Sequence, residues 1–323
     1  MDALTDSVVE VDDGAELRAL SFSIAHHGMR LDRALVELVP EFSRSYLQQL
    51  IELGFVKLNA VQTHKPAQKI KAFDTGSIEL RPTPQSQAFK AEHMALEVVY
   101  VDEHLMVINK PAGLVVHPAP GNWSGTLMNG LLGFDANAFH LPRAGIVHRL
   151  DKDTSGLMVV ARNRSTMDAL VKAIAARTVK RQYVALAHGA WQGASRREVN
   201  APIGRDPSNR LRMAAVDLAV HAGKTALTEI DLIASGATTC LVRCTLHTGR
   251  THQIRVHMAL LKHPLIADAV YGGAIAAGMQ RQALHAFHLR FEHPQTQQWL
   301  SFESPLPVDM RAAIENLGLQ YNS

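Results

Sequence analysis

The segment GIVHRLDKDTSGLMVVAR, residues 145–162, combines groups that could do chemistry with a pattern that would display them. Apolar residues on either side of its charged run predict two strands, so the run is expected to be a loop at the end of a sheet, where reactive groups are often presented. Within it, Asp151 lies between Arg149 and Lys152, and nearby positive charges keep a carboxylate ionised, as a nucleophile or a base requires. On spacing alone, a tight turn in which Asp151 and Asp153 accept bonds from backbone amides is the stronger alternative.

A second segment, TLHTGRTHQIRVHMALLKHPLIAD, predicts a helix that begins near Thr251 and buries an apolar face. His252 and Arg255 are three residues apart and share another face, from which Arg255 could meet a partner carboxylate. The alternative is an exposed arginine on an amphipathic helix. In a third segment, KRQYVALAHG, Tyr183 points to one face of a predicted strand, and the ordinary interpretation is a core aromatic.

The net charge of +3 hides an uneven distribution of charged residues. Residues 1–18 contain six acids and one arginine, whereas residues 143–181 contain nine Lys or Arg against three Asp, and residues 243–262 contain four Lys or Arg and no acid. Positive charge concentrated in this way indicates a polyanionic partner. The alternative is that these residues form ordinary solvated faces.

The elements that must position these groups divide the 323 residues into about two domains. Residues 1–21 are expected to be an acidic disordered tail, and residues 22–82 a compact α/β unit of two helices and short strands. A polar, proline-containing segment at 83–96 is expected to be a linker. Residues 97–318 are dense in predicted strands, and several of these follow one another without an intervening helix. This order predicts an α+β fold with a mixed, mostly antiparallel sheet and flanking helices, and argues against a doubly wound sheet.

At least three helices are expected in the larger domain, near residues 126–132, 165–177 and 251–261. For the second of them we expect Ser165 to be the N-cap and Val171 to belong to the buried stripe.

Cysteine usage and the absence of sorting signals indicate a cytoplasmic protein. Cys240 and Cys244 lie four residues apart in a predicted strand, which is too far for a disulfide, so both are expected to be reduced core residues. No apolar run is long enough to span a membrane, and the acidic N-terminus fits neither a secretory nor a mitochondrial signal.

The seventeen histidines suggest a metal site, but their spacing does not support one. The chain contains neither HExxH nor CxxC, and it has no glycine-rich phosphate-binding motif. We therefore expect no metal and no cofactor.

Taken together, HRLDKDTSGL, KRQYVALAHG and GRTHQIRVHM resemble the three motifs of the RluA-type family of RNA pseudouridine synthases. Residues 22–82 resemble the small S-four-like RNA-binding domain that precedes the catalytic domain in the enzymes of the large ribosomal subunit. One departure is Asn59-Ala60, at a turn where Asn-Gly is usual. The runs VINKPAGLVVHPAPGNWSGTLMNGLL, NAPIGRDP, HPLIADAVYGG and RQALHAFHLRFEHP are similar to the D-type group of this family.

The resemblance implies a cofactor-free isomerase that converts uridines of large-subunit (23S) rRNA, or of a pre-ribosomal particle, to pseudouridine. For the D type the implied target is the helix 69 stem-loop, and a monomer is the default state. Asp151 would be the catalytic aspartate, Arg255 its partner, and Tyr183 would lie against the target uracil. Arg149 would fill the space that the flipped uridine vacates, and His148 would support that loop. Further RNA contacts would come from Arg143, Arg162, Arg164, Lys180, Arg181 and Arg250.

Three alternatives have to be weighed against this interpretation. A non-catalytic RNA-binding protein of ribosome assembly would not need the Asp, Tyr and Arg positions filled, whereas this chain fills all three. A synthase acting on another rRNA or tRNA site would carry the same motifs. A metal-dependent RNA hydrolase would need clustered ligands that the sequence does not show.

Overall fold

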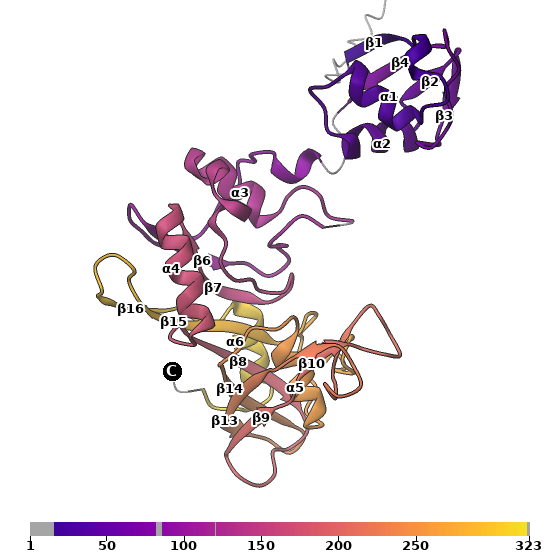
Figure 1. Ribbon diagram of the computed structural model, residues 1–323. Coiled ribbons are helices and arrows are strands. Elements are labelled where there is room, and N and C mark those ends of the chain that lie inside the picture. Colours follow the sequence, from indigo (N-terminus) through magenta and orange to yellow (C-terminus); the bar gives the residue numbers. More distant parts are fainter. Residues whose placement is uncertain (1–15, 82–85, 120, 322–323) are drawn as a thin grey trace, which may run out of the picture. The chain divides into compact units, whose positions relative to one another are not determined.

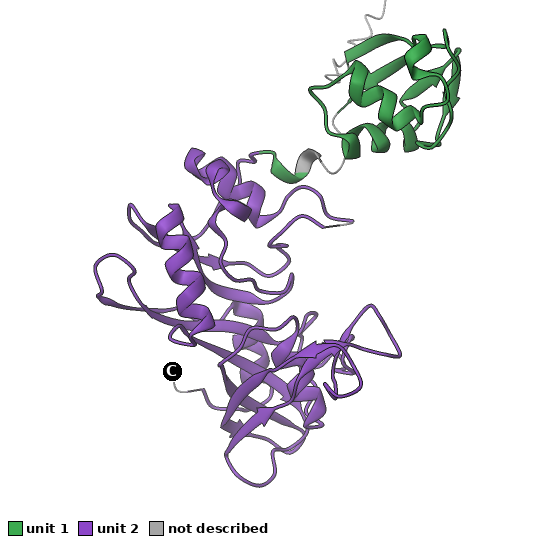
Figure 2. Cartoon of the chain, in the orientation of Figure 1, with its two compact units in different colours: residues 1–90 green, residues 91–323 purple. Residues whose placement is uncertain are grey.

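The computed structural model describes residues 16–81, 86–119 and 121–321. The chain forms two compact units, residues 1–90 and 91–323 (Figure 2). The division falls within the segment 83–96 that the sequence suggests as a linker. In the described part of the chain no helix is long and apolar enough to cross a membrane.

The first unit packs two helices on a four-stranded antiparallel sheet with the strand order β1-β4-β2-β3 (Figure 1). Ser43 caps the second helix by accepting a hydrogen bond from the backbone N–H of Tyr46. The elements are β1 (Glu16–Ser21), α1 (Leu31–Leu38), α2 (Arg44–Glu52), β2 (Val56–Leu58), β3 (Val61–Thr63) and β4 (Thr75–Leu80), with short 3-10 turns at Ile24–His26 and Ser86–Phe89.

The expected disordered tail is wrong for its last six residues. Glu16–Ser21 form strand β1, which pairs with β4 along its whole length and buries Leu20 against the core of the unit. The acidic composition of the preceding residues hides this strand, because its own sequence, ELRALS, places only one side chain in the core. Residues 1–15 lie outside the described part of the chain.

The second unit is built on a nine-stranded sheet with the order β5-β6-β7-β15-β8-β14-β13-β9, to which β16 adds beside β15. Only the β7–β15 pair among the described pairs of this sheet is parallel, so the predicted mixed, mostly antiparallel α+β fold is confirmed. The strands are β5 (Val98–Val101), β6 (Leu105–Lys110), β7 (Ser155–Ala161), β8 (Lys180–His188), β9 (Arg196–Asn200), β13 (Leu227–Ser235), β14 (Thr239–Leu246), β15 (Leu284–Glu292) and β16 (Trp299–Glu303).

A small three-stranded sheet and the helices complete the second unit. The sequence did not predict this sheet or α6. The small sheet contains β10 (Ile203–Arg205), β11 (Met213–Ala215) and β12 (Gly223–Lys224). The helices are α3 (Leu127–Phe134), α4 (Arg164–Ala175), α5 (Gln253–Leu260) and α6 (Val308–Asn316), with 3-10 turns at Ala136–His140 and Pro142–Gly145.

Helix α4 corrects two expectations. Asn163, not Ser165, is its N-cap, because the Asn163 side chain accepts the backbone N–H of Thr166 at 2.9 Å while the Ser165 hydroxyl donates to the same oxygen. Val171 was expected in the buried stripe but is 45% exposed. The predicted buried, unpaired state of Cys240 and Cys244 is confirmed, and burial raises the pKa of the Cys240 thiol to about 12.

Candidate active site

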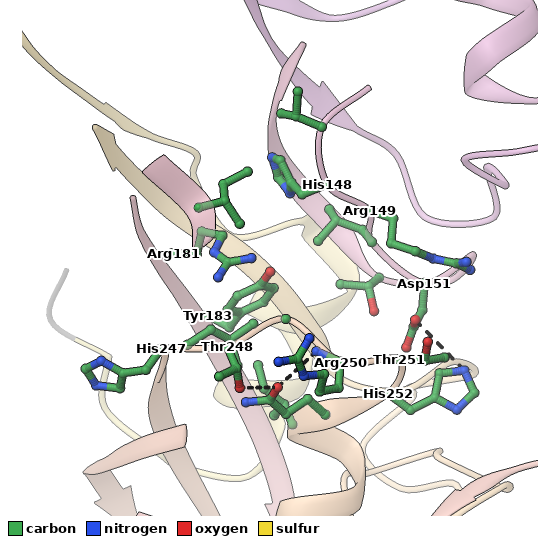
Figure 3. Close-up of a pocket in the computed structure, with 18 of the residues that line it drawn as sticks. His148, Arg149, Asp151, Arg181, Tyr183, His247, Thr248, Arg250, Thr251 and His252 are labelled. Atoms are coloured by element: carbon green, nitrogen blue, oxygen red, sulfur yellow. Dashed lines mark hydrogen bonds and ion pairs between the residues drawn. The ribbon is translucent and has the colours of Figure 1, made fainter. Parts of the chain in front are cut away.

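A cavity of about 560 Å³ lies in the second unit, where the loop before β7, strand β8, helix α4 and the β14–α5 loop meet (Figure 3). Asp151 is the one acidic side chain among the described residues that line it. The arginines in its lining are Arg143, Arg149, Arg177, Arg181, Arg250 and Arg255. A concave surface with this balance of charge favours a polyanionic ligand.

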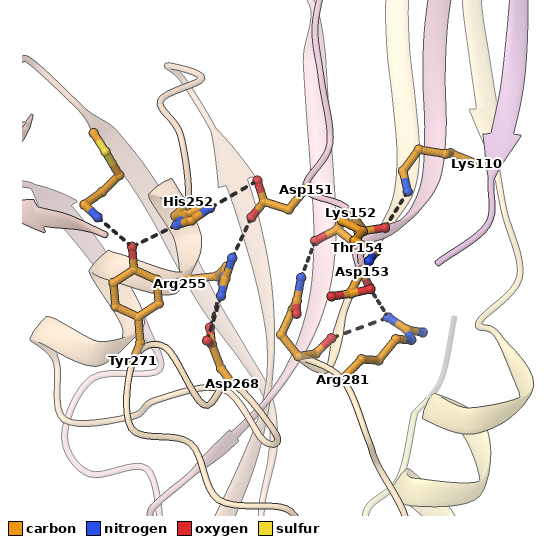
Figure 4. A network of polar contacts seen from close by, with 12 residues as sticks. Lys110, Asp151, Lys152, Asp153, Thr154, His252, Arg255, Asp268, Tyr271 and Arg281 are labelled. Carbon is orange, nitrogen blue, oxygen red and sulfur yellow. Dashed lines mark hydrogen bonds and ion pairs between the residues drawn. The ribbon is translucent and has the colours of Figure 1, made fainter. Parts of the chain in front are cut away.

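The structure brings Asp151 and Arg255 together although they are 104 residues apart in the sequence. Arg255 donates from Nη1 to Asp151 Oδ2 at 3.1 Å (Figure 4). Its Nε and Nη2 donate to the two oxygens of Asp268 at 2.7 and 2.8 Å. Arg255 is only 6% exposed, so the alternative of a solvent-exposed arginine is wrong.

One guanidinium therefore bridges two carboxylates. Burial opposes the charge of Arg255, but Asp268 and Asp151 outweigh that effect and keep its pKa above the ordinary value. Asp268 is fully buried, whereas Asp151 keeps part of its carboxylate open to the cavity. Because Asp268 fixes the guanidinium at two points, the remaining N–H groups have a defined direction toward Asp151.

His252 and Tyr271 complete this network, and the sequence did not assign them a role. His252 Nε2 lies 3.9 Å from Asp151 Oδ1, and its Nδ1 is 2.9 Å from the Tyr271 hydroxyl. The backbone N–H of Met213 donates to that hydroxyl, whose own proton can then go to His252 Nδ1. Burial lowers the pKa of His252, so the neutral ring would carry its single proton on Nε2, which faces Asp151.

His252 also shows why helix α5 begins where it does. Its backbone lies in the left-handed region at φ 57°, directly before the first helical residue, Gln253. A non-glycine residue in this conformation is uncommon and often marks a functional site. The conformation turns the chain so that His252 and Arg255 both reach Asp151.

Tyr183 lies on β8 and is 5% exposed, yet it also lines the cavity. The interpretation as a core aromatic is therefore correct for its burial but incomplete. Burial raises the pKa of its hydroxyl to about 12, which keeps it protonated near neutral pH.

Buried contacts hold the Asp151 loop from behind. Lys110, at the end of β6, donates from Nζ to the carbonyl oxygens of Pro111, Leu114 and Lys152 at 2.7–2.9 Å. Figure 4 shows the contact with Lys152. Burial lowers its pKa to about 7, against the attraction of Asp153 and Asp151. On the other side, Arg281 donates to the carbonyl oxygen of Asp153 at 2.8 Å.

His148 supports the same loop in the neutral state. Its Nε2 accepts the backbone N–H of Val159, in strand β7, at 3.0 Å. Burial, and secondarily Arg181, lowers its pKa to about 3.

The predicted RNA contacts fall into two sets. His148, Arg143, Arg149, Arg181 and Arg250 line the cavity with Asp151. The other three do not: Arg162 pairs with Asp135, Arg164 pairs with Asp168, and Lys180 is exposed at the start of β8.

Asp268 and Tyr271 lie in the run HPLIADAVYGG, which the sequence marks as similar to the D-type group but gives no role. Neither charge nor local spacing reveals that they reach Arg255 and His252. In the described part of the chain, no three His, Cys, Asp or Glu side chains are grouped so that they could hold a metal ion.

Comparisons with known proteins show which family the chain is similar to. The sequence pattern of the family RNA pseudouridylate synthase matches residues 104–260. Ribosomal large subunit pseudouridine synthase D of Neisseria meningitidis serogroup B is 45% identical over 306 residues, which cover 91% of this chain and 80% of the relative. The protein of the same name from Nitrosomonas europaea is 45% identical over 90% of this chain and 86% of its own length.

A solved structure has a similar fold. Human RNA Pseudouridylate Synthase Domain Containing 1 matches with a TM-score of 0.52 and 28% identity, over 65% of this chain and 83% of that chain. The motifs, the fold and the relatives agree, and the chain belongs to the RNA pseudouridylate synthase family, whose members isomerise uridine to pseudouridine.

Proposed function

We propose that this protein converts uridines of large-subunit (23S) rRNA to pseudouridine, with Asp151 as the catalytic aspartate. One observation carries the proposal: among the described residues that line the cavity, Asp151 is the single acid, and it is held by Arg255 among arginines that would attract RNA. The names of the Neisseria and Nitrosomonas relatives support rRNA as the substrate.

The reaction breaks the bond between ribose C1′ and N1 of uracil, turns the base, and joins C1′ to its C5. Asp151 would either attack C1′ or take a proton from the neighbouring ribose carbon. The Arg255 guanidinium would hold this carboxylate in a fixed orientation through the bond from Nη1 to Oδ2. The protein needs no redox partner and no hydrolytic water, because substrate and product have the same atoms.

The other cavity residues would bind and open the RNA. Tyr183 would lie against the flipped uracil, where base stacking contributes about 1–3 kcal/mol. Arg149 is exposed beside Asp151 and would take the place of the extruded nucleotide. Arg143 and Arg250 would contact phosphates at the cavity, and Arg162, Arg164 and Lys180 would contact RNA farther away.

The more specific proposals concern target and context. We propose that the modified uridines lie in the helix 69 stem-loop and that the first unit is an S-four-like RNA-binding domain. The substrate would be free rRNA or a pre-ribosomal particle. The protein would act as a monomer in the cytoplasm.

The direct test is to map pseudouridines across the large-subunit rRNA of a strain that lacks this protein. We expect pseudouridines to be lost from helix 69, restored by the wild-type gene, and not restored by Asp151→Asn expressed at the same level. Loss at another rRNA or tRNA site would correct the target alone. An unchanged map, or full restoration by the variant, would contradict the proposed function.

A further inference from the structure

Arg181 is a buried cation for which the described part of the chain supplies no anion. It is 5% exposed, its Nε has no hydrogen-bond partner, and no acidic group of the described residues lies within ion-pair distance. Burial lowers its pKa, and the neighbouring positive charge of Arg250 adds to this effect. Burial of a charge without a partner is costly, so an arginine in this state needs a reason to be there.

Arg255, in the same cavity, shows the usual arrangement. It is about as buried as Arg181, but Asp268 and Asp151 neutralise it. Substitution of Arg255 would break two ion pairs, whereas substitution of Arg181 breaks none that the structure shows. We therefore expect substitution of Arg255 to destabilise the folded unit and substitution of Arg181 to leave it equally stable or more stable.

The surroundings of Arg181 form a built site. Arg181 and Tyr183 are two residues apart on β8, so their side chains leave the same face of the strand, and Figure 3 shows the guanidinium beside the hydroxyl end of the ring. The backbone of Gly249 closes the other side, because a Cβ there would lie 2.8 Å from Arg181 Nη1. Arg250, which follows, is held by a 3.0 Å bond from Nε to the Thr225 carbonyl oxygen and adds a second positive charge.

We propose that Arg181, assisted by Arg250, forms an anion subsite that receives a negatively charged oxygen of the bound RNA. The inference rests on the proposed function. Two parts of the substrate offer this chemistry: a phosphodiester beside the target uridine, and the uracil itself. When the C1′–N1 bond breaks, the electron pair leaves with the base and its carbonyl oxygens share the charge. Once C5 has bonded to C1′, C5 loses its proton and N1 gains one.

The experiment pairs Arg181→Met with modified stem-loop substrates and follows both equilibrium binding and single-turnover rate. One set of RNAs carries a neutral methylphosphonate linkage on either side of the target uridine. A second set carries 5-fluorouridine, whose base is a better leaving group. Because fluorine replaces the C5 proton that must leave, the rate followed on these RNAs is that of loss of the 5-fluorouridine, not of pseudouridine formation. Arg181→Lys keeps the charge, and Arg311→Met, an exposed arginine on α6, is the matched control.

If the anion is a phosphate, Arg181→Met should weaken binding of the unmodified RNA about tenfold. On the RNA with a methylphosphonate in place of that phosphate, the variant and the wild type should bind equally well. If it is the departing uracil, binding should hold while the rate falls about 100-fold, with a smaller fall on 5-fluorouridine. Arg181→Lys should recover part of either loss, and Arg311→Met should match the wild type.

A stability measurement keeps the proposal open to refutation without any activity. Because no ion pair is lost, the melting temperature of Arg181→Met without RNA should equal or exceed that of the wild type. A clear drop in melting temperature would show that Arg181 has a structural role. The same conclusion would follow if Arg181→Met reduced affinity and rate by the same factor on every modified RNA as on the unmodified RNA. If wild-type protein binds the RNA but makes no pseudouridine, the proposed function is wrong. The binding and melting measurements would still test whether Arg181 receives an anion of the RNA.

Discussion

Each unit of the molecule contains a fully buried carboxylate that is hydrogen-bonded to arginine, but the numbers of the two groups are reversed. One carboxylate binds two arginines in the first unit, and one arginine binds two carboxylates in the second. In the first unit, Asp32 accepts bonds from Arg30, Arg44 and Gln48 at 2.6–3.1 Å. In the second unit, the single guanidinium of Arg255 serves two carboxylates.

The difference separates a structural ion pair from a reactive one. Both oxygens of Asp32 are occupied, and the side chains of Arg30 and Arg44 remain 40% and 47% exposed, so this cluster presents positive charge outward. Asp151 lines the cavity and has one oxygen bonded to Arg255, while its Oδ1 accepts no hydrogen bond from the described residues and lies 3.9 Å from His252 Nε2. A carboxylate that is held but not saturated keeps an oxygen available for reaction.

Among the changes that compare the two carboxylate clusters, the largest effect should follow from Asp268→Asn, which breaks the shared arrangement around the Arg255 guanidinium. The amide removes a buried negative charge and one of two acceptor oxygens, so Arg255 loses its fixed direction toward Asp151. We expect the single-turnover rate to fall by about 100-fold or more, with RNA affinity changed less than about threefold. A wild-type rate in a folded variant would show that Asp268 does not position Arg255.

Asp32→Asn is the matched change in the first unit and should separate stability from rate. Two half-exposed arginines lose their buried partner, and we expect the unit to lose roughly 1–3 kcal/mol. Hydrogen exchange of α1 and α2 in the full chain would report the loss. The single-turnover rate on a short stem-loop should stay at the wild-type value, and a large fall would mean that the two clusters are coupled.

Acid should destabilise the two units in different pH ranges. Burial lowers the pKa of His148 to about 3 and that of His285 to about 4. Below about pH 6.5 these histidines are therefore protonated in the unfolded chain but remain neutral in the folded unit. The free energy of unfolding then falls as the pH drops, by up to about 1.4 kcal/mol per pH unit for each histidine. In the first unit, bonds from Arg30, Arg44 and Gln48 lower the pKa of Asp32, so that contribution is lost only below about pH 4.

Tryptophan fluorescence can separate these ranges, because all three tryptophans lie in residues 91–323. Denaturant unfolding followed by fluorescence should shift to lower denaturant between pH 6.5 and 5. Equal stability at these two pH values would contradict the assignment of neutral buried histidines.

The smallest effect should come from the turn between β2 and β3. Asn59 and Ala60 form its two-residue loop with φ 50° and 63°, a conformation that Gly adopts without strain and Ala does not. Ala60→Gly should stabilise the first unit by about 0.5–1 kcal/mol, with no change in catalytic rate. Denaturation of the first unit followed by hydrogen exchange is the measurement, and destabilisation would show that the turn geometry does not limit stability.

The sequence predicts well what local patterns determine. Apolar runs place most strands of the large sheet in the second unit, and the motifs that contain Asp151, Tyr183 and Arg255 are visible without a structure. Asp268 and Tyr271 act through contacts that only tertiary packing creates, so no spacing rule finds them. Spacing places His252 with Arg255 but does not reveal its contact with Tyr271. Strand β1 was missed because an acidic neighbourhood outweighed its six residues, and the cap of α4 because Asn163 and Ser165 are both good capping residues.

The central claim is that Asp151 supplies the reactive carboxylate, and the most direct test is the single-turnover rate of Asp151→Asn with RNA affinity measured on the same sample. The amide is nearly the same size but cannot carry the negative charge. We expect no detectable pseudouridine while affinity stays within about tenfold, or about 1.4 kcal/mol, of the wild type. Turnover near the wild-type rate would remove Asp151 from the reaction and leave the Arg255 bridge as a structural feature.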